Sequence, residues 1–432
     1  MVHLLRELVV IGAGPKAVAV AAKAWALRAC GGEVPRITVV EQRGIAAHWQ
    51  AGGGWTNGRH YLGTPPEKDV GFPYATAIAG NRGSEVDRLL EQVSWKSFLL
   101  ATGGYARWLD RGRPAPTHDR WAEYLQWVAR TIGMEVLHAT VERCERVDSA
   151  RWECVVRDAA GRRSMVSADA VLVTGPGPAT DVLSTAPGVW SVAQLWERSA
   201  ALAPGGRWVL VGSGESAGAV AQELIYRGVD SLTLVSPQAT AFSRGESQFE
   251  NSLYSDPGAW QGFDAQARRA VLARTDRGVL SRRAQEALAL SDSVEHVSGV
   301  ARRARSVDGV VHLEVERPGA VVSELEADVV VDCRGGDPLW FLSLLGGQAR
   351  AELTAECGGL LSPEAVAEVL QPTMWCGGMP LLVPALAGWS QGPGFANLSC
   401  LGALADRVLG GLGVELGEES AASVSSVPVV AS

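Results

Sequence analysis

Two stretches of this sequence share one design: LVVIGAGPKA, from Leu8 to Ala17, and WVLVGSGESAGA, from Trp208 to Ala219. Each starts with four apolar, mostly β-branched residues typical of a buried parallel strand, continues into G-x-G-x-x-A, and ends in an alanine-rich helical pattern. A second apolar segment follows each helix, RITVVE ending at Glu41 and SLTLVS ending at Ser236. The sequence therefore predicts two βαβ units of the kind that binds dinucleotides.

The glycines of each unit suit a phosphate-binding turn. In the first unit, Gly12 permits the tight strand-to-helix turn, Gly14 lets the backbone approach a pyrophosphate, and Ala17 keeps the helix close to the sheet. The helix N-terminus then offers free N–H groups and a positive dipole to the phosphates. The predicted phosphate contacts are Gly12, Gly14, Pro15 and Ala17 in the first unit, and Gly212, Ser213, Gly214, Glu215 and Ser216 in the second.

The residue at the end of each second strand distinguishes the two nucleotides. Glu41 can accept hydrogen bonds from an adenosine ribose, as a site for FAD or NAD requires. At the equivalent point the second unit has Ser236, with no carboxylate to repel a 2′-phosphate, and Arg244 follows shortly after. This favours NADPH at the second unit. The alternative is that Ser236 merely ends a strand and Arg244 is a surface charge.

Two further apolar strands, within residues 168–177 and 327–338, end in glycine-rich turns that would pass the chain from one nucleotide domain to the other. We therefore expect an α/β fold with two Rossmann-like dinucleotide-binding domains and a small helical substrate-binding region. The predicted divisions are an FAD-binding domain at 1–188 completed by 370–411, an NADPH-binding domain at 189–337, a helical region at 338–369 with a contribution from 245–290, and a disordered tail at 412–432.

Composition limits the partners. The chain has 432 residues, 47% of them hydrophobic and 20% charged, with a formal net charge of −8. An acidic balance argues against binding nucleic acid or an anionic membrane, since both need a basic face. The seven cysteines are widely spaced without a metal-binding pattern, which fits a reducing cytoplasm and predicts no metal site. We also expect no export signal and no membrane span, whereas a homo-oligomer stays open.

Two classes of flavoprotein are disfavoured by what the sequence lacks. Disulfide reductases need a dithiol pair facing the flavin, and no two cysteines here are close enough in sequence to suggest one. Baeyer-Villiger enzymes carry a motif with a histidine before the second glycine-rich turn, whereas this chain has PGVWSVAQLWERS there.

Four longer segments carry a specific resemblance: HWQAGGGWTNGRHYLGTPPEKDVGFPY at 48–74, RGESQFENSLYSDP at 244–257, ARTDRGV at 273–279 and QGPGFANLSCLG at 391–402. In combination they resemble the N-hydroxylating flavin monooxygenases, and most of all the lysine N6-hydroxylases of mycobactin-type and nocobactin-type siderophore pathways. The resemblance extends from about residue 8 to about residue 410.

The resemblance implies non-covalent FAD, reduction by NADPH, and reaction of the reduced flavin with O2 to a C4a-hydroperoxide whose distal oxygen hydroxylates L-lysine to N6-hydroxylysine for a hydroxamate siderophore. Free lysine has a pKa of ~10.4, so presenting its neutral amine at pH ~8 costs roughly 3 kcal/mol, which a dry, uncharged pocket can supply. Two alternatives stay open. One is an ornithine or other diamine N-hydroxylase, since one methylene is worth only about 1–3 kcal/mol in a pocket. The other is a non-hydroxylating FAD/NADPH redox or sensor protein.

The resemblance also implies substrate contacts. Lys68 matches the lysine that pairs with the substrate α-carboxylate, and Asn251 matches the asparagine that binds the amino-acid head group. Asp276 matches a position near the α-amine, and Ser399 matches a position near the reacting amine. For each there is a simpler alternative: a solvated lysine, a turn or capping asparagine, a turn-capping aspartate, and a helix N-cap at Ser399 or Asn397.

The loops that would reach the flavin show both matches and departures. Trp49 and Gln50 lie in the loop that approaches it, and Gly394 and Leu398 lie in the C-terminal segment that would cover it. Gly63 occupies the place of a flavin-contacting glutamine in ornithine hydroxylases, so flavin contacts in this loop must differ. Those enzymes also place an arginine for the NADPH phosphate where this chain has Pro237, which weakens the case for strict NADPH selectivity.

Overall fold

The computed structural model describes residues 5–148 and 151–416, and its first glycine-rich segment lies in the centre of a six-stranded sheet. The strand order is β16-β17-β7-β1-β2-β3, and β1 pairs in parallel with both β2 and β7. The bounds are β1 Glu7–Ile11, β2 Arg36–Val40, β3 Val136–Leu137, β7 Ala170–Val173, β16 Trp375–Cys376 and β17 Met379–Leu382. The C-terminal strand β17 thus completes a sheet begun at the N-terminus.

The second glycine-rich segment lies in a five-stranded parallel sheet of order β11-β10-β9-β15-β8. Here β9 lies between β10 and β15, as β1 lies between β2 and β7. The bounds are β8 Val189–Ser191, β9 Arg207–Val211, β10 Ser231–Ser236, β11 Val294–Ser298 and β15 Val329–Asp332. The apolar runs form central strands because helices and loops cover both faces of a parallel sheet, and Val9, Val10 and Leu210 are buried. The predicted α/β fold is confirmed.

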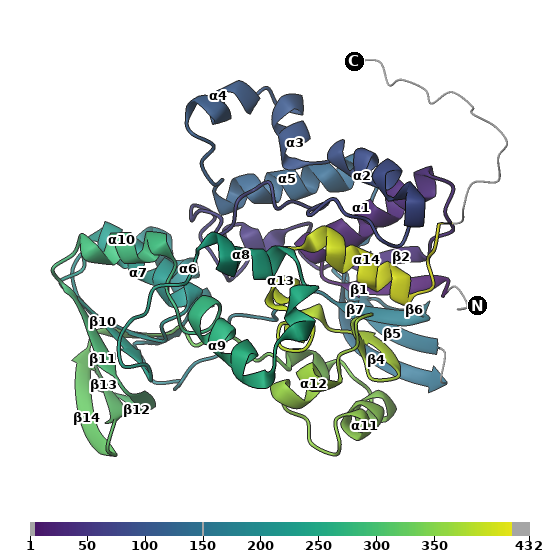
Figure 1. The fold of residues 1–432 in the computed structure, drawn as a ribbon. Coiled ribbons are helices and arrows are strands. Elements are labelled where there is room, and N and C mark those ends of the chain that lie inside the picture. The colour runs from purple at the N-terminus through teal and green to yellow at the C-terminus, as the bar shows by residue number, and fades with distance from the viewer. Residues whose placement is uncertain (1–4, 149–150, 417–432) are drawn as a thin grey trace.

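Helices cover one face of the first sheet, where α1, α5 and α14 lie side by side (Figure 1). The helices of this first unit are α1 Pro15–Ala29, α2 Gly83–Glu91, α3 Trp95–Ala101, α4 Tyr105–Asp110, α5 His118–Thr131, α11 Gly347–Glu356, α12 Pro363–Val369, α13 Pro393–Ala396 and α14 Leu401–Gly411. In the second unit they are α6 Val192–Arg198, α7 Glu215–Arg227 and α10 Arg282–Ala289. Helices α8 Gln248–Ser255 and α9 Ala265–Thr275 lie between the two units (Figure 1).

Each unit also carries a three-stranded antiparallel sheet that the sequence patterns did not predict. In the first unit it consists of β4 Ala139–Asp148, β5 Arg151–Asp158 and β6 Arg163–Ala168, and in the second of β12 Val300–Val307, β13 Val310–Arg317 and β14 Val321–Ala327. Cys144 and Cys154 are register partners across β4 and β5, with their Sγ atoms 3.0 Å apart and both side chains fully buried. The thiols that looked isolated in sequence are therefore a pair in space.

The chain crosses between the units twice, and the two crossings pack against each other. After β7, the carbonyl of Gly175 accepts a hydrogen bond from Trp340 Nε1 at 3.2 Å, and that of Gly177 accepts one from Trp55 Nε1 at 3.0 Å. After β15, a Cβ atom on Gly336 would lie 2.7 Å from the carbonyl oxygen of Pro178. Close backbone contact at the crossings therefore holds the two units together.

The helical region predicted at 338–369 packs with the first unit. Phe341, Leu353 and Val366 belong to the same core as β1 and α1. Helix α8, from the predicted 245–290 contribution, packs against α13 of the same unit. Residues 412–416 of the predicted tail are described, whereas 417–432 lie outside the described residues.

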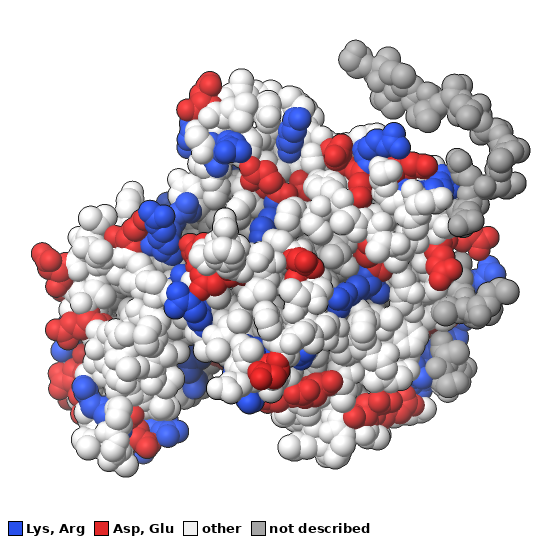
Figure 2. Space-filling model, viewed as in Figure 1, with Lys and Arg blue, Asp and Glu red and all other residues white. Residues whose placement is uncertain are grey.

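Acidic and basic side chains are interspersed over the face drawn in Figure 2. Ion pairs among the described residues include Arg82 with Glu85 and Arg207 with Asp328. Within residues 5–148 and 151–416, no helix is long and apolar enough to cross a membrane.

The contact of α14 with the loop at residues 71–72 gives a test of the fold. A Cβ atom on Gly402 would lie 2.2 Å from the carbonyl oxygen of Gly71, and the Gly402 N–H donates to the Phe72 carbonyl at 2.7 Å. We expect Gly402→Ala to lower the free energy of unfolding by about 1–3 kcal/mol through overpacking. Gly347→Ala is the control, since a Cβ atom there meets nothing within 4 Å. Equal midpoints for the two variants in thermal unfolding would contradict the close contact.

Candidate nucleotide and substrate sites

The first glycine turn has the geometry of a phosphate site. Gly12 has a φ of +93°, and Gly14 is the N-cap of α1, where a Cβ atom would meet nothing within 4 Å. Glu41 is 8% exposed, and its carboxylate accepts the N–H groups of Ala13 at 3.2 Å and Arg43 at 2.8 Å. The carboxylate thus lies at the edge of the glycine turn, where a ribose hydroxyl would reach it.

The second glycine turn repeats this geometry. Gly212 has a φ of +128°, and Gly214 is the N-cap of α7. In the described part of the chain, no side chain accepts a hydrogen bond at the N-cap of α1 or α7. Helices α3, α5, α6, α8, α9, α10 and α12, in contrast, each begin on a Ser, Thr or Asp whose side chain accepts an N–H of the first turn. Helices α4, α11 and α13 also begin on a glycine without a side-chain cap. Helices α1 and α7 differ from these because each directly follows a central strand of a parallel sheet, β1 or β9, so their N-terminal amides are suited to phosphate and fit two dinucleotides.

Around the second turn the structure adds residues that sequence patterns missed. Ser213 Oγ lies 3.0 Å from Gln238 Oε1 and donates to the carbonyl of Gly278 at 3.1 Å. Ser236 is buried, and its Oγ lies 2.9 Å from Nε2 of His296 on the neighbouring strand. The contact between Ser236 and His296 favours the interpretation of Ser236 as a strand-ending residue. Gln238 and Gly278 instead approach the turn through their contacts with Ser213.

Arg244 joins this second turn to the first unit. Its guanidinium lies 3.5 Å from Glu215 at the start of α7, 3.2 Å from Glu246, and donates to the carbonyl of Gly63 at 3.2 Å. Gly63, predicted to lie beside the flavin, thus contacts the second unit. Ser216, which was also predicted to contact the second nucleotide, is the second residue of α7.

The loop at residues 48–74 brings Lys68 beside the C-terminal segment. Lys68 is half-buried, its Nζ lies 5.5 Å from the centroid of the Phe72 ring, and burial lowers its pKa while the nearby Cys400 opposes that shift. Trp49 packs edge-on against His118 with ring centroids 4.8 Å apart, and Gln50 follows it at the end of a short 3₁₀ helix. Lys68 is therefore no freely solvated lysine.

The residue after Lys68 is a buried carboxylate that sequence analysis did not single out. Asp69 is 2% exposed and accepts hydrogen bonds from the Tyr74 hydroxyl at 2.7 Å, the Gly71 N–H at 3.1 Å and the Trp95 N–H at 2.8 Å. Burial raises its pKa to about 6 against the effect of these donors. Asp69 ties the backbone next to Lys68 to the start of α3.

The other predicted substrate residues surround the contact of α8 with α13. A Cβ atom on Gly394 would lie 2.1 Å from the Tyr254 carbonyl oxygen of α8 and 2.8 Å from Cys400 Sγ. Ser399, beside Cys400, is 8% exposed, and its N–H donates to Asn397 Oδ1 at 2.8 Å. The N-cap of α14 is Cys400, so neither Asn397 nor Ser399 caps that helix.

Asn251 and Asp276 approach this region from α8 and α9. Asn251 is exposed, lies within α8, and its Nδ2 donates to the Glu246 carbonyl at 2.9 Å, while Ser247 caps the helix. Asp276 ends α9, where burial raises its pKa, and it faces Tyr254. Leu398 packs against the first core. Lys68 thus lies near Cys400, the residue after Ser399, and Asp276 lies near Tyr254, which shares helix α8 with Asn251.

Lys16 is a further buried charge beside the first turn. It is 6% exposed, its Nζ donates to the Ala396 carbonyl at 2.8 Å, and burial lowers its pKa to about 8. Cys400 lies near Lys16, Lys68 and Arg407. The sequence did contain a signal for this buried lysine. Lys16 directly follows Gly-x-Gly-Pro and precedes the apolar run AVAVAA, where a charged residue is unexpected.

The raised pKa of Asp69 gives a pH test. The folded protein holds this proton more tightly than the unfolded chain, whose carboxyl has the ordinary value of 3.8. Its contribution to the free energy of unfolding is therefore present at low pH and lost as the pH rises from ~4 to ~6, by up to about 3 kcal/mol. We expect the stability of the wild type relative to Asp69→Asn to fall over this interval and then level off.

Urea midpoints measured from pH 4 to pH 8 would check this. Asp158→Asn is the control, since Arg162 lowers the pKa of Asp158 and the sign of its pH dependence is opposite. A constant difference between wild type and Asp69→Asn would show that Asp69 titrates normally.

Comparisons with known proteins agree with this arrangement. A family model described as L-lysine 6-monooxygenase/L-ornithine 5-monooxygenase matches residues 91–289. L-lysine N6-monooxygenase MbtG of Mycobacterium sp. (strain MCS) is 45% identical over 431 residues, covering 98% of this chain and 99% of the relative. The structure of lysine monooxygenase NbtG from Nocardia farcinica, which shows an unprecedented NADPH domain conformation, superposes with a TM-score of 0.84 at 39% identity, covering 93% of this chain and 98% of that one.

The ornithine N-hydroxylase KtzI of Kutzneria sp. 744, solved with reduced FAD, NADP+ and L-ornithine, shares the fold with a TM-score of 0.72 at 16% identity, covering 94% and 99% of the two chains. The near-complete match to MbtG establishes the family. The chain belongs to the lysine and ornithine N-monooxygenases.

Proposed function

We propose that this protein is an FAD- and NADPH-dependent monooxygenase that hydroxylates the side-chain amine of L-lysine to N6-hydroxylysine for a hydroxamate siderophore. The observation that carries the proposal is the pair of glycine turns that join a central parallel strand to the N-terminus of α1 or α7, in a chain 45% identical to L-lysine N6-monooxygenase MbtG. One such turn has a ribose-binding carboxylate, Glu41, and the other has Arg244. These features suit FAD at the first unit and NADPH at the second.

Bound FAD would take electrons from NADPH and use them to activate O2 for transfer of one oxygen atom. The chain's own residues bind and orient the reactants. The α1 N-terminus and Glu41 hold the first nucleotide, and the α7 N-terminus with Arg244 holds the second. Lys68 would fix the α-carboxylate of the substrate, so that the far amine is delivered at a defined distance.

The far amine of the substrate would have to be neutral to react, and a dry, uncharged pocket around it would favour that form through desolvation. Lys68 has a different task at the other end of the substrate, where its ammonium would have to keep its charge to pair with the α-carboxylate.

We also propose the domain division 1–188 with 370–411, 189–337, and the helical segments 245–290 and 338–369, with the site residues as predicted from the sequence. A cytoplasmic location, the lack of a nucleic-acid partner and the choice of oligomer stay predictions.

Ornithine is a second candidate substrate, because the matching family model covers both lysine and ornithine monooxygenases. Purified protein loaded with FAD should form hydroxylamine only when NADPH, O2 and the correct amine are all present. A panel of L-lysine, L-ornithine, cadaverine and acyl-lysine separates the candidates. NADPH oxidation without hydroxylamine for every amine would instead support a non-hydroxylating flavoprotein.

Lys68→Ala tests the substrate anchor. Loss of a charge-assisted hydrogen bond to the carboxylate should raise the KM for L-lysine about 10–100-fold, with a smaller change in kcat. Lys96→Ala is the control, since Lys96 is exposed on α3. A KM for Lys68→Ala equal to that of the control would rule out the anchoring role.

Glu41→Ala tests the flavin site. Without the carboxylate at the turn, the Kd for FAD, measured by flavin fluorescence on the stripped protein, should rise by about tenfold or more. The exposed Glu33 of the same unit supplies the control variant, Glu33→Ala. If both variants retained FAD equally, Glu41 would not contact the nucleotide.

A further inference from the structure

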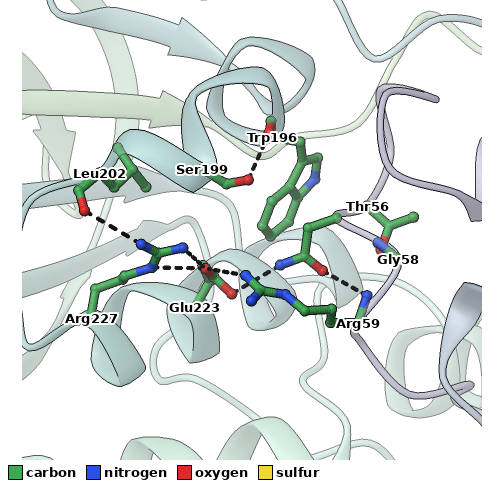
Figure 3. Close-up of polar contacts among 9 residues, drawn as sticks. Thr56, Gly58, Arg59, Trp196, Ser199, Leu202, Glu223 and Arg227 are labelled. Carbon is green, nitrogen blue, oxygen red and sulfur yellow. Dashed lines mark hydrogen bonds and ion pairs between the residues drawn. The ribbon is translucent and has the colours of Figure 1, made fainter.

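A buried carboxylate lies at the contact between the two nucleotide units. Glu223, on α7, is 6% exposed, and its Oε1 accepts hydrogen bonds from Nε and Nη2 of Arg227 at 3.0 and 2.9 Å on the same helix. From the first unit, Asn57 Nδ2 donates to Oε2 at 3.0 Å and Arg59 Nη2 lies 3.3 Å from Oε1. Figure 3 shows Arg59 and Arg227 approaching Glu223 from opposite sides. We call these four residues the Glu223 cluster.

The segment that carries Asn57 and Arg59 is firmly part of the first unit. The carbonyls of Gly58 and His60 accept the N–H groups of Asp119 at 2.9 Å and His118 at 2.7 Å, both at the start of α5. The Arg59 N–H donates to Asn57 Oδ1 at 3.0 Å, which orients the amide so that its Nδ2 faces Glu223. The first unit therefore presents a preformed pair of donors to α7.

The same segment, residues 54–63, contacts the second unit at each end of the cluster. Trp55 packs with the second core, and the His60 ring lies 5.1 Å from that of Trp196 on α6. At the far end, the carbonyl of Gly63 accepts the Arg244 guanidinium. Lys68 follows five residues later in the chain. Segment 54–63 therefore connects the second nucleotide turn to the proposed substrate anchor.

We propose that Glu223 is a positioning residue that fixes the second unit against the first, through Asn57 and Arg59, in the orientation from which NADPH reduces the flavin. The proposal rests on the proposed function, because electron transfer from NADPH requires the two nucleotides to meet at a defined distance. A buried carboxylate suits this role, since any orientation that separates it from Asn57 and Arg59 leaves it Arg227 alone and removes its contacts with the first unit. Apolar contacts alone would tolerate sliding.

Arg227 allows a matched comparison. It bonds the same carboxylate as Asn57 and Arg59 but lies on α7 itself, so Arg227→Ala removes a partner of Glu223 without removing a contact between the units. Asn57→Ala and Arg59→Ala remove the contacts between the units. If the cluster only adds stability, all three variants should behave alike.

Two measurements on the FAD-loaded protein distinguish these outcomes. In anaerobic stopped-flow experiments, we expect the limiting rate of flavin reduction by NADPH to fall about tenfold in Asn57→Ala and Arg59→Ala and to stay within about twofold of wild type in Arg227→Ala. Hydrogen–deuterium exchange in segment 54–63 should accelerate in the first two variants and not in the third. FAD content and the Kd for NADP+ should be unchanged in all three.

A charge exchange provides a rescue. Asn57→Asp alone places two carboxylates together and should slow flavin reduction, whereas Asn57→Asp combined with Glu223→Gln restores one amide and one carboxylate and should recover the rate. An unchanged limiting rate in folded Asn57→Ala and Arg59→Ala, or an equal loss in Arg227→Ala, would overturn the proposal. A wild-type protein that NADPH does not reduce would refute the proposed function instead, and the exchange measurement would still test the contact.

Discussion

The structure depends on unpaired backbone amides at the N-termini of two long helices. An α-helix leaves its first N–H groups without partners, and most other helices here pair one of them with a Ser, Thr or Asp side chain. Helices α1 and α7 begin on Gly14 and Gly214, which have no such side chain. Each therefore gains from an external anion, and each follows the central strand of a parallel sheet. The fold supplies these two anion sites and holds them in one chain.

Much of this frame could be predicted because it is local. A strand, a glycine turn, a helix and a second strand lie within about 35 residues of sequence, so their periodicity is visible without knowledge of the fold. The sequence also predicted that residues 370–411 return to the first domain, although not that this segment contributes β17 beside β7. The antiparallel sheets were missed because register between strands such as β4 and β5 depends on tertiary packing.

The site was less predictable than the frame, for a physical reason. The motif residues Lys68 and Ser399 are visible as residue types, but the groups that set their environment come from distant segments. Asp69 is held by Trp95 of α3, and Cys400 approaches both Lys16 and Lys68. The surroundings of Ser236 were equally invisible in the sequence, because its hydroxyl contacts His296 of β11, a strand some 60 residues further along the chain. Burial and partner identity, which decide charge and pKa, are properties of the folded chain.

The fold and the candidate site are linked in segment 54–63, which contacts both nucleotide units. A monooxygenase with separate nucleotide sites must let NADPH enter and NADP+ leave without exposing the substrate pocket to water, so the units need a contact that is strong in one orientation and weak in others. The crossings near Gly177 and Gly336 are closely packed, since a Cβ atom on either glycine would overlap Trp340 or the Pro178 carbonyl. Glu223 adds a directional contact, because its hydrogen bonds with Asn57 and Arg59 depend on the angle between the units whereas its pair with Arg227 lies within α7. Orientation is thereby set by electrostatics, while cohesion comes from packing.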